Sequence, residues 1–495
     1  MRIGLSTVSS PIQTVMIIGT GPAACSAART LLDGNPHIKV VMLSESPSSY
    51  ISPASSTTKG WTRGKSSSYE SHLPSIIQTS GPCKSRKLTL PIGRGLGGST
   101  RINAMLHFNL FTSFGSSNSS ILSASKQIDS ELKSNKKVEP NIIDPTYIKT
   151  LGLKLQTSSG YKSSQFYTST FENKRVNSFQ ALYLDTLNPH FTVLYNSRVD
   201  KLNFNMERTH VTSLTLSTGK SVHLTSTTTL ILSCGSICSP LLLDRSGYDC
   251  LENNKVYDHP VLPILYFSPT SLSKVKKSNT GVQGWWSGDE DRVQFMIFDG
   301  DVVVELLEHV TEVFRRSYEN IFKDIFFKLL FLWAFYNVYI VRLFLPKFIK
   351  NWLGNHLVCI NIQPVKVKSN GKINKDGSFS TNFFENEEDK ITLNKAWKVF
   401  QKDFDKPLKE KGCINILPGP LSSNILTYAG HFTTSYFHPH SSLSHVVNED
   451  FGLKGVENLK VADASVVKEG FGGPTALGCM GVGRKVGEII LEENK

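Results

Sequence analysis

Several features that define other classes of protein are absent from this chain of 495 residues. Its eight cysteines form no CxxC pair, so neither a zinc ribbon nor a disulfide scaffold is indicated. The net charge of +13 comes without a zinc-finger or RNP-type motif, and the Lys and Arg residues are spread along the chain. No nucleic-acid partner is therefore expected, although an anionic membrane surface or an acidic substrate stays open.

Long apolar runs are also scarce. None precedes the first strand as a signal peptide would require, which favours a cytoplasmic or membrane-surface location. One aromatic-rich segment, residues 325–345, is broken by charged and polar residues and is short for the ~20 apolar residues of a spanning helix. Three interpretations stay open: a buried helix, an interfacial helix giving peripheral membrane contact through residues 325–350, or a transmembrane span.

The N-terminal part contains a strand, a glycine turn, a helix and a second strand between residues 14 and 45. Gly19 allows a sharp turn, Gly21 allows the backbone to approach a pyrophosphate, and Ala24 permits close packing of helix on strand. Glu45 follows the second strand, where an acid accepts hydrogen bonds from a ribose diol. An acid here disfavours the 2′-phosphate of NADP, so the pattern predicts an FAD or NAD site.

Further glycine-rich segments follow in a definite order. Residues 93–103 read GRGLGGSTRIN, a loop whose backbone must pass close to a ligand. This segment resembles a signature of the glucose–methanol–choline (GMC) oxidoreductases, FAD enzymes that act mostly on alcohols. The other segments that resemble the family are Asp258-His259-Pro260, residues 235–247 (GSICSPLLLDRSG), 437–439 (FHP), 455–466 (GVENLKVADASV) and 472–475 (GGPT).

The resemblance implies an α/β fold with two domains. A Rossmann-like FAD-binding domain would be assembled from the discontinuous segments 1–110, 190–260 and 430–495. An inserted α+β, sheet-based substrate domain would comprise 111–189 and 261–429, including an apolar helix at 325–345. Within the first of these inserted segments, residues 112–140 are rich in Ser, Lys and Asn and are interpreted as loop-like or partly disordered.

The resemblance also implies which residues bind the cofactor. The ADP half of FAD would lie against Gly19, Gly21, Ala24 and Glu45, and the adenine against the backbone of Val199. The flavin side and the pyrophosphate would be lined by Gly93, Arg94, Gly97, Gly98, Ser99, Asn103, Asp463, Ala464, Pro474 and Thr475.

At the catalytic centre, the resemblance assigns the general base to His438. A base beside the flavin takes the alcohol proton while hydride passes to flavin N5, and histidine suits this because its pKa lies near neutrality. On residue type alone a structural core histidine is the better interpretation, and the family context favours catalysis. A separate acceptor, whether oxygen, a quinone or a protein, would reoxidise the flavin. The aromatic segment 325–345 favours an apolar or lipid-like alcohol.

Two departures from the family pattern bear on the reaction. Gly473 stands where members usually carry a second His or an Asn, and the usual Gly-Thr after His-Pro is missing, so His440 or Ser441 is a candidate substitute. No metal is expected, because no carboxylate or cysteine lies close to these histidines in the sequence. Two alternative functions follow: a lyase or photodecarboxylase on the same flavin scaffold, or a catalytically impaired, membrane-associated flavin-binding protein.

Overall fold

The computed structural model describes most of the chain. The apolar segment 325–345 lies outside the described residues, so its three interpretations and the membrane contact through 325–350 stay predictions. Within the part that the structure describes, no helix is both long and apolar enough to cross a membrane. The described residues are 13–48, 76–79, 81–83, 86–107, 118–141, 143–163, 166–172, 174–274, 280–288, 293–304, 346–419, 424–468 and 470–494.

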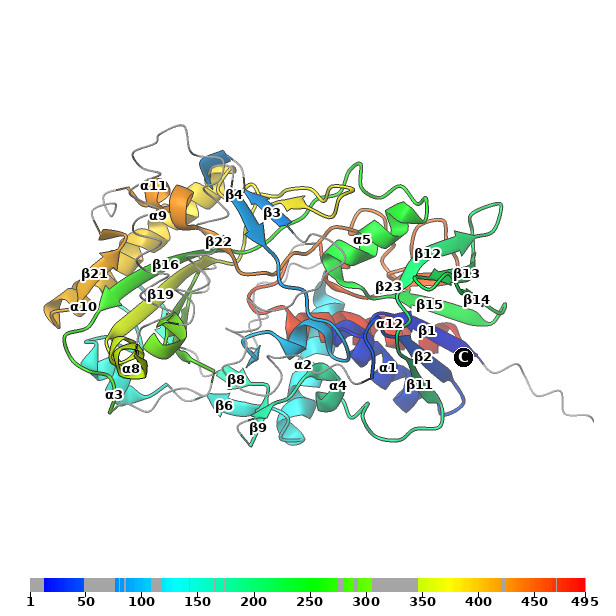
Figure 1. The fold of residues 1–495 in the computed structure, drawn as a ribbon, viewed down its shortest axis with the longest axis horizontal. Coiled ribbons are helices and arrows are strands. Elements are labelled where there is room, and N and C mark those ends of the chain that lie inside the picture. The colour runs from blue at the N-terminus through cyan, green and yellow to red at the C-terminus, as the bar shows by residue number, and fades with distance from the viewer. Residues whose placement is uncertain are drawn as a thin grey trace, which may run out of the picture.

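A five-stranded parallel sheet, drawn at the right of Figure 1, is built from distant parts of the chain. Its central strands consist mainly of apolar and β-branched residues, as expected for strands covered on both faces. This sheet confirms the Rossmann-like part of the predicted α/β fold. Its strands, in spatial order, are β11 (Phe191–Leu194), β2 (Lys39–Leu43), β1 (Thr14–Ile18), β15 (Thr228–Leu232) and β23 (Leu459–Val461).

Three helices pack together beside this sheet: α1 (Pro22–Gly34), α2 (Ser119–Ser134) and the C-terminal α12 (Ala476–Glu493). Helices α1 and α12 approach closely because Gly483 has no side chain; a Cβ there would lie 2.0 Å from the carbonyl oxygen of Ala23. The last helix of the chain therefore packs directly on the first.

Helix α2 (Ser119–Ser134) corrects the interpretation of residues 112–140 as loop-like. Ile121, Ile128 and Leu132 form a buried stripe at helical spacing, which the polar composition of the segment hides. They belong to the same apolar core as the parallel sheet, although residues 111–189 were expected in the substrate domain.

A larger antiparallel sheet occupies the other end of the molecule in Figure 1. Phe295 and Ile297 point to one face, where α9 (Glu387–Phe400) packs, while Met296 and Phe298 belong to a separate cluster on the other face. Its strands, in spatial order, are β21 (Ile414–Leu417), β16 (Pro260–Phe267), β19 (Leu357–Pro364), β18 (Val293–Phe298), β17 (Val282–Ser287) and β7 (Lys162–Ser163), with β22 (Thr434–Ser435) also paired to β16.

Shorter elements complete the described fold. A small antiparallel sheet comprises β12 (Val199–Phe204), β13 (Val211–Leu216) and β14 (Ser221–His223), and α5 (Gly235–Arg245) follows β15. The others are β3 (Ile76–Thr79), β4 (Arg86–Thr89), β5 (Leu106–His107), β6 (Glu139–Asn141), α3 (Pro145–Thr150), β8 (Phe166–Thr168), β9 (Thr170–Phe171), β10 (Lys174–Arg175), α4 (Ser178–Ala181), α8 (Lys347–Gly354), β20 (Phe379–Ser380), a π-helix at Gln401–Asp405, α10 (Lys406–Glu410) and α11 (Ile425–Phe432).

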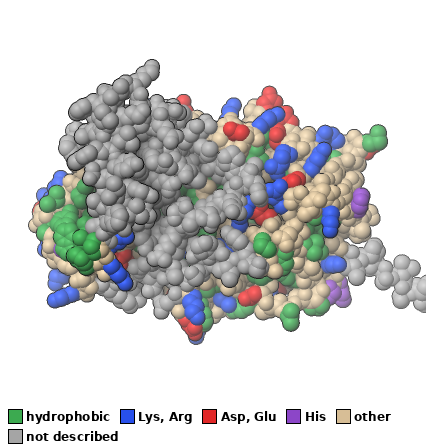
Figure 2. Space-filling model, viewed as in Figure 1, with side chains coloured by type: hydrophobic (Ala, Val, Ile, Leu, Met, Phe, Trp, Pro, Cys, Tyr) green, Lys and Arg blue, Asp and Glu red, His purple; other side chains and the backbone are tan. Residues whose placement is uncertain are grey.

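The described surface carries charges of both signs, as the spread of charged residues along the sequence predicts. On the face shown in Figure 2, Lys and Arg side chains are scattered and interspersed with Asp and Glu rather than gathered in one stripe. A continuous basic track of the kind that follows a nucleic-acid backbone is not seen among the described residues of this face.

Candidate active site

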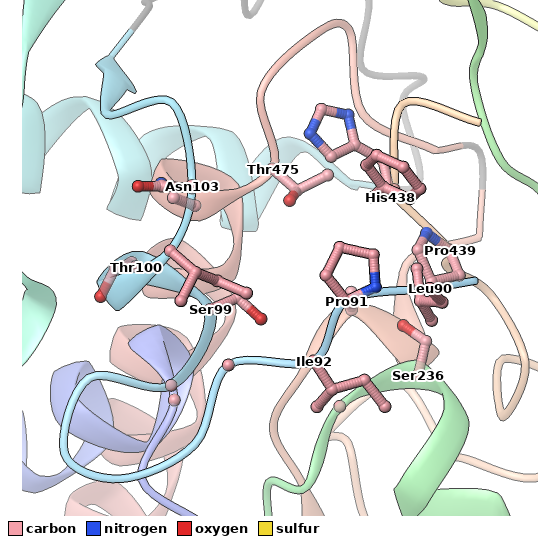
Figure 3. Close-up of a pocket in the computed structure, with 18 of the residues that line it drawn as sticks. Leu90, Pro91, Ile92, Ser99, Thr100, Asn103, Ser236, His438, Pro439 and Thr475 are labelled. Carbon is pink, nitrogen blue, oxygen red and sulfur yellow. The ribbon is translucent and has the colours of Figure 1, made fainter. Parts of the chain in front are cut away.

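A pocket of about 520 Å³ lies where the carboxyl ends of the parallel strands face the antiparallel sheet. Open α/β sheets bind ligands at this edge, because the loops that follow the strands diverge there. Figure 3 shows that the pocket is enclosed by side chains from separate parts of the chain, including Leu90, Ser99, Ser236, His438 and Thr475.

The glycine turn after β1 forms one wall of this pocket. Gly19 has a φ of +116°, and a Cβ there would lie 2.1 Å from the carbonyl oxygen of Ser233, so only glycine fits. A Cβ added at Gly21, by contrast, would meet nothing within 4 Å. Helix α1 begins at the next residue, so its free N–H groups and positive dipole end border this open space. The space suits a pyrophosphate.

The loop 93–98 packs on this turn and completes the wall. A Cβ at Gly98 would lie 2.7 Å from the Cα of Gly21. The Thr20 hydroxyl donates to the carbonyl of Gly95 at 2.9 Å, and the Gly97 N–H donates to the carbonyl of Thr20 at 2.8 Å. The two glycine-rich segments therefore form one rigid cradle.

Glu45 lines the pocket just beyond the end of β2, where a ribose diol was expected. Its carboxylate pairs with the guanidinium of Arg94 at 3.1 Å. This pair places Arg94 at the Glu45 end of the pocket, whereas the resemblance assigns it to the flavin side. Ser197 and Val199 line the pocket as well, and Val199 is the position expected to contact adenine.

The loop around Asn103, which was expected on the flavin side, is held by a residue that sequence reasoning missed. Arg175 is buried; its guanidinium donates to the Asn103 side-chain oxygen at 2.9 Å and to the carbonyl oxygens of Asn103 at 2.7 Å and Thr100 at 3.1 Å. No motif marks Arg175 in the sequence, since it lies in a region outside the family signatures.

Asp463 joins the last strand of the parallel sheet to α5. Its carboxylate accepts the Gly235 N–H at 2.9 Å, the Ser239 hydroxyl at 2.5 Å and the Ser465 N–H at 2.8 Å. Because these donors occupy both oxygens, the carboxylate fixes the shape of the pocket wall to which Asp463 and Ala464 belong.

The expected site residues separate into two groups. The pocket is lined by Gly19, Gly21, Glu45, Gly93, Arg94, Gly98, Ser99, Asn103, Val199, His438, Asp463, Ala464, Pro474 and Thr475. Outside its lining are Ala24, Gly97, His440 and Ser441. Ala24 is fully buried in the core beneath the turn, and Gly97 packs on Asn177.

His438 lines the pocket within a cluster of three histidine rings. Its Nδ1 lies 3.2 Å from Nδ1 of His259, and the two rings meet edge to face. Burial, together with nearby His440, lowers the pKa of His438 to about 3. The ring is therefore neutral near pH 7 and can accept a proton.

His440 and Ser441 lie behind His438 rather than beside it in the pocket. Nδ1 of His440 lies 2.9 Å from the carbonyl oxygen of His438 and can only donate to it. The Ser441 hydroxyl donates to the carbonyl oxygen of Val467, and both side chains are buried. Their hydrogen bonds hold the loop, so neither supplies a polar group to the pocket in place of the one missing at Gly473.

Tyr436 supplies a polar group that sequence reasoning did not assign. It lines the pocket, and its ring lies 4.4 Å from that of His438, edge to face. Its hydroxyl contacts the Met296 sulfur at 3.4 Å, and a thioether is a weak acceptor. The only sequence signal for Tyr436 was its position two residues before His438.

The antiparallel sheet contributes a mainly apolar wall. Val261, Pro263 and Leu265 of β16 line the pocket with Phe298 of β18, and Asn361 of β19 is a polar exception among these sheet residues. This wall lines the same pocket as the nucleotide cradle and suits an apolar ligand. Among the described residues, no group of three or more His, Cys, Asp and Glu side chains has the arrangement of a metal site.

Comparison with known proteins agrees with this architecture. The GMC oxidoreductase family model for the C-terminal domain matches residues 365–483. No curated protein sequence matches the chain. Similar solved structures include pyridoxine 4-oxidase from Mesorbium loti, at 14% identity and a TM-score of 0.67, covering 96% of this chain and 98% of that one.

Two further solved structures have the same fold. A formate oxidase variant from Aspergillus oryzae has 16% identity and a TM-score of 0.64, covering 98% of this chain and 99% of its own. A fungal aryl-alcohol oxidase has 13% identity and a TM-score of 0.64, covering 98% of this chain and 100% of its own.

Fold and pocket thus define an α/β protein with a dinucleotide cradle beside an apolar cavity. Residues 365–483 match the GMC oxidoreductase family, whose cofactor is FAD, and the whole chain shares its fold with pyridoxine 4-oxidase and formate oxidase. The described residues fit that cofactor, since the open space at Gly21 borders the helix N-terminus and Glu45 lines the same pocket just beyond β2. The family match, the fold and the cradle together support FAD-dependent oxidoreduction.

Proposed function

We propose that the protein oxidises the CH–OH group of an apolar alcohol, with His438 as the general base. The observation that carries the proposal is the placement of a neutral, partly buried His438 ring in the lining of the pocket. Because Nδ1 faces His259, Nε2 is the nitrogen left for a molecule in the pocket. Bound FAD would accept the hydride from the alcohol carbon.

The low pKa of His438 is compatible with this role. As hydride leaves the carbon, the hydroxyl group takes on the character of a protonated carbonyl and becomes strongly acidic. A weak, neutral base can then take its proton, whereas an imidazolium could not. The buried site keeps His438 in its neutral form, so the ring is ready before the substrate enters.

The second contact to the reacting oxygen is assigned to Tyr436. Gly473 offers no side chain there, and among the described residues the phenol of Tyr436 contacts the Met296 sulfur, a weak acceptor. The hydroxyl would form a stronger hydrogen bond with a substrate oxygen than with the thioether sulfur. The apolar wall of Val261, Pro263 and Leu265 supports a substrate with an apolar body.

Gly473 also supports a second candidate, a flavin-binding protein that does not oxidise alcohols. Anaerobic mixing of the FAD-loaded protein with a panel of aliphatic and aromatic alcohols separates the two. Bleaching of the flavin absorbance by any alcohol supports the enzyme. A stable flavin spectrum with every alcohol tested, at full FAD occupancy, supports the second candidate.

A further inference from the structure

Two histidine rings share one hydrogen bond between identical atoms. Nδ1 of His259 and Nδ1 of His438 lie 3.2 Å apart, so when both rings are neutral only one of the two nitrogens carries the proton. If His259 donates, the proton of His438 must sit on Nε2, and that atom cannot accept another. If His438 donates, its Nε2 keeps a lone pair. The direction of this bond decides whether His438 can act as a base.

The surroundings of His259 favour the arrangement in which His438 donates and His259 accepts. Burial lowers the pKa of His259 well below its ordinary value, with His438 and His440 adding to the shift, while the backbone carbonyls of Phe471 and Val365 oppose it. Because Nδ1 faces His438, the nitrogen left to these carbonyls is Nε2, which is buried without a hydrogen bond of normal geometry. A carbonyl oxygen can only accept, so it favours a proton on Nε2 and leaves Nδ1 as the acceptor.

The backbone holds the two rings in this relation. The N–H groups of both histidines donate to one oxygen of Asp258, at 2.8 Å from His259 and 2.9 Å from His438. The Tyr436 N–H donates to the carbonyl oxygen of His259 at 2.9 Å. His440 cannot replace His259, because its own Nδ1 is committed to the His438 carbonyl.

We propose that His259 is a positioning residue: it accepts the Nδ1 proton of His438 and thereby keeps the Nε2 lone pair of His438 available to the pocket. This role rests on the proposed function of His438. His259 is 0% exposed and does not line the pocket, so it acts through His438 alone. A neutral acceptor also adds no charge to the buried site, unlike the carboxylate that orients the histidine of a Ser-His-Asp triad.

The test compares His259→Phe, which fills the space without an acceptor, with His259→Asn, whose side-chain oxygen can replace Nδ1. His440→Phe is the matched control, since that ring is equally buried and contacts His259. NMR of the FAD-loaded protein with ¹⁵N-labelled histidine, assigned with His438→Asn, reports which nitrogen of His438 carries the proton. FAD content and thermal melting check that each variant folds.

We expect the His438 proton on Nδ1 in the wild type, His259→Asn and His440→Phe, and a shift to Nε2 in His259→Phe. Flavin reduction by an active alcohol should slow at least ~10²-fold in His259→Phe, since the wrong tautomer of a catalytic histidine costs up to about 10⁴-fold. His259→Asn should restore most of the rate, with substrate affinity unchanged. A wild-type proton on Nε2, or an unchanged tautomer in His259→Phe, would overturn the proposal. These spectra need no substrate, so they stand even if no alcohol reduces the flavin.

Discussion

A single oxygen of Asp258 accepts the backbone N–H of His438 across the pairing of β16 with β22, at 2.9 Å. The carboxyl group also accepts from His259 and from the hydroxyl of Ser435. Burial nevertheless raises the pKa of Asp258 to about 7. The carboxyl that holds the His438 loop is therefore half-protonated near neutral pH.

The raised pKa of Asp258 predicts how the free energy of unfolding depends on pH. The folded protein keeps a proton on Asp258 between about pH 4 and 7, where the unfolded chain has lost it. The stabilising contribution is therefore fully present below about pH 4 and is lost as the pH rises to about 7. Asp258→Asn cannot ionise, and the titrating histidines are common to both proteins. The difference in Tm, wild type minus variant, should fall from pH 4 to pH 8; a constant difference would contradict the assignment.

Removal of the proposed base, His438, should slow the reaction without removing the cofactor. His438→Ala should slow flavin reduction at least ~10²-fold, within the range of general base catalysis. FAD content should stay unchanged, because the cradle around Gly21 lies on other segments. Stopped-flow absorbance of the anaerobic protein measures both quantities. An unimpaired rate would remove His438 from this role.

The phenol of Tyr436 should contribute a hydrogen bond in the reaction. Tyr436→Phe should slow flavin reduction by about 10-fold to 10²-fold, somewhat less than the loss of a preorganised oxyanion donor in other enzymes. Met296→Leu is the control, since it removes only the sulfur that the hydroxyl contacts in the free protein. Equal rates in Tyr436→Phe and the wild type would show that the phenol does not contact the reacting oxygen.

The open space at Gly21 gives a test of the cofactor site that needs no substrate. Its φ is −75°, a value that alanine adopts freely, so Gly21→Ala should fold normally. The added methyl group would occupy the cradle and should weaken FAD binding at least ~10-fold, which corresponds to about 1.4 kcal/mol. Fluorescence titration of the apoprotein with FAD measures the change. Undiminished affinity would place the pyrophosphate elsewhere.

Much of the cofactor half could be predicted because its residues act through local backbone geometry. Gly19 and Gly21 follow an apolar strand directly, and the high glycine content of residues 93–103 indicates a loop. The reacting half could not be predicted in the same way. His440 and Ser441 adjoin His438 in sequence, yet their side chains bind backbone carbonyls behind it.

The sequence by itself determined the dinucleotide turn, the parallel strands and the resemblance to the GMC family, since each depends on short segments whose residue types set the backbone. Only the tertiary structure decided what surrounds His438. It brought His259 to 3.2 Å from His438 across 179 positions of chain, and placed Tyr436 against the same ring. Contacts of this kind depend on how β16 pairs with β22 and on how two sheets enclose one pocket, and no local pattern encodes them.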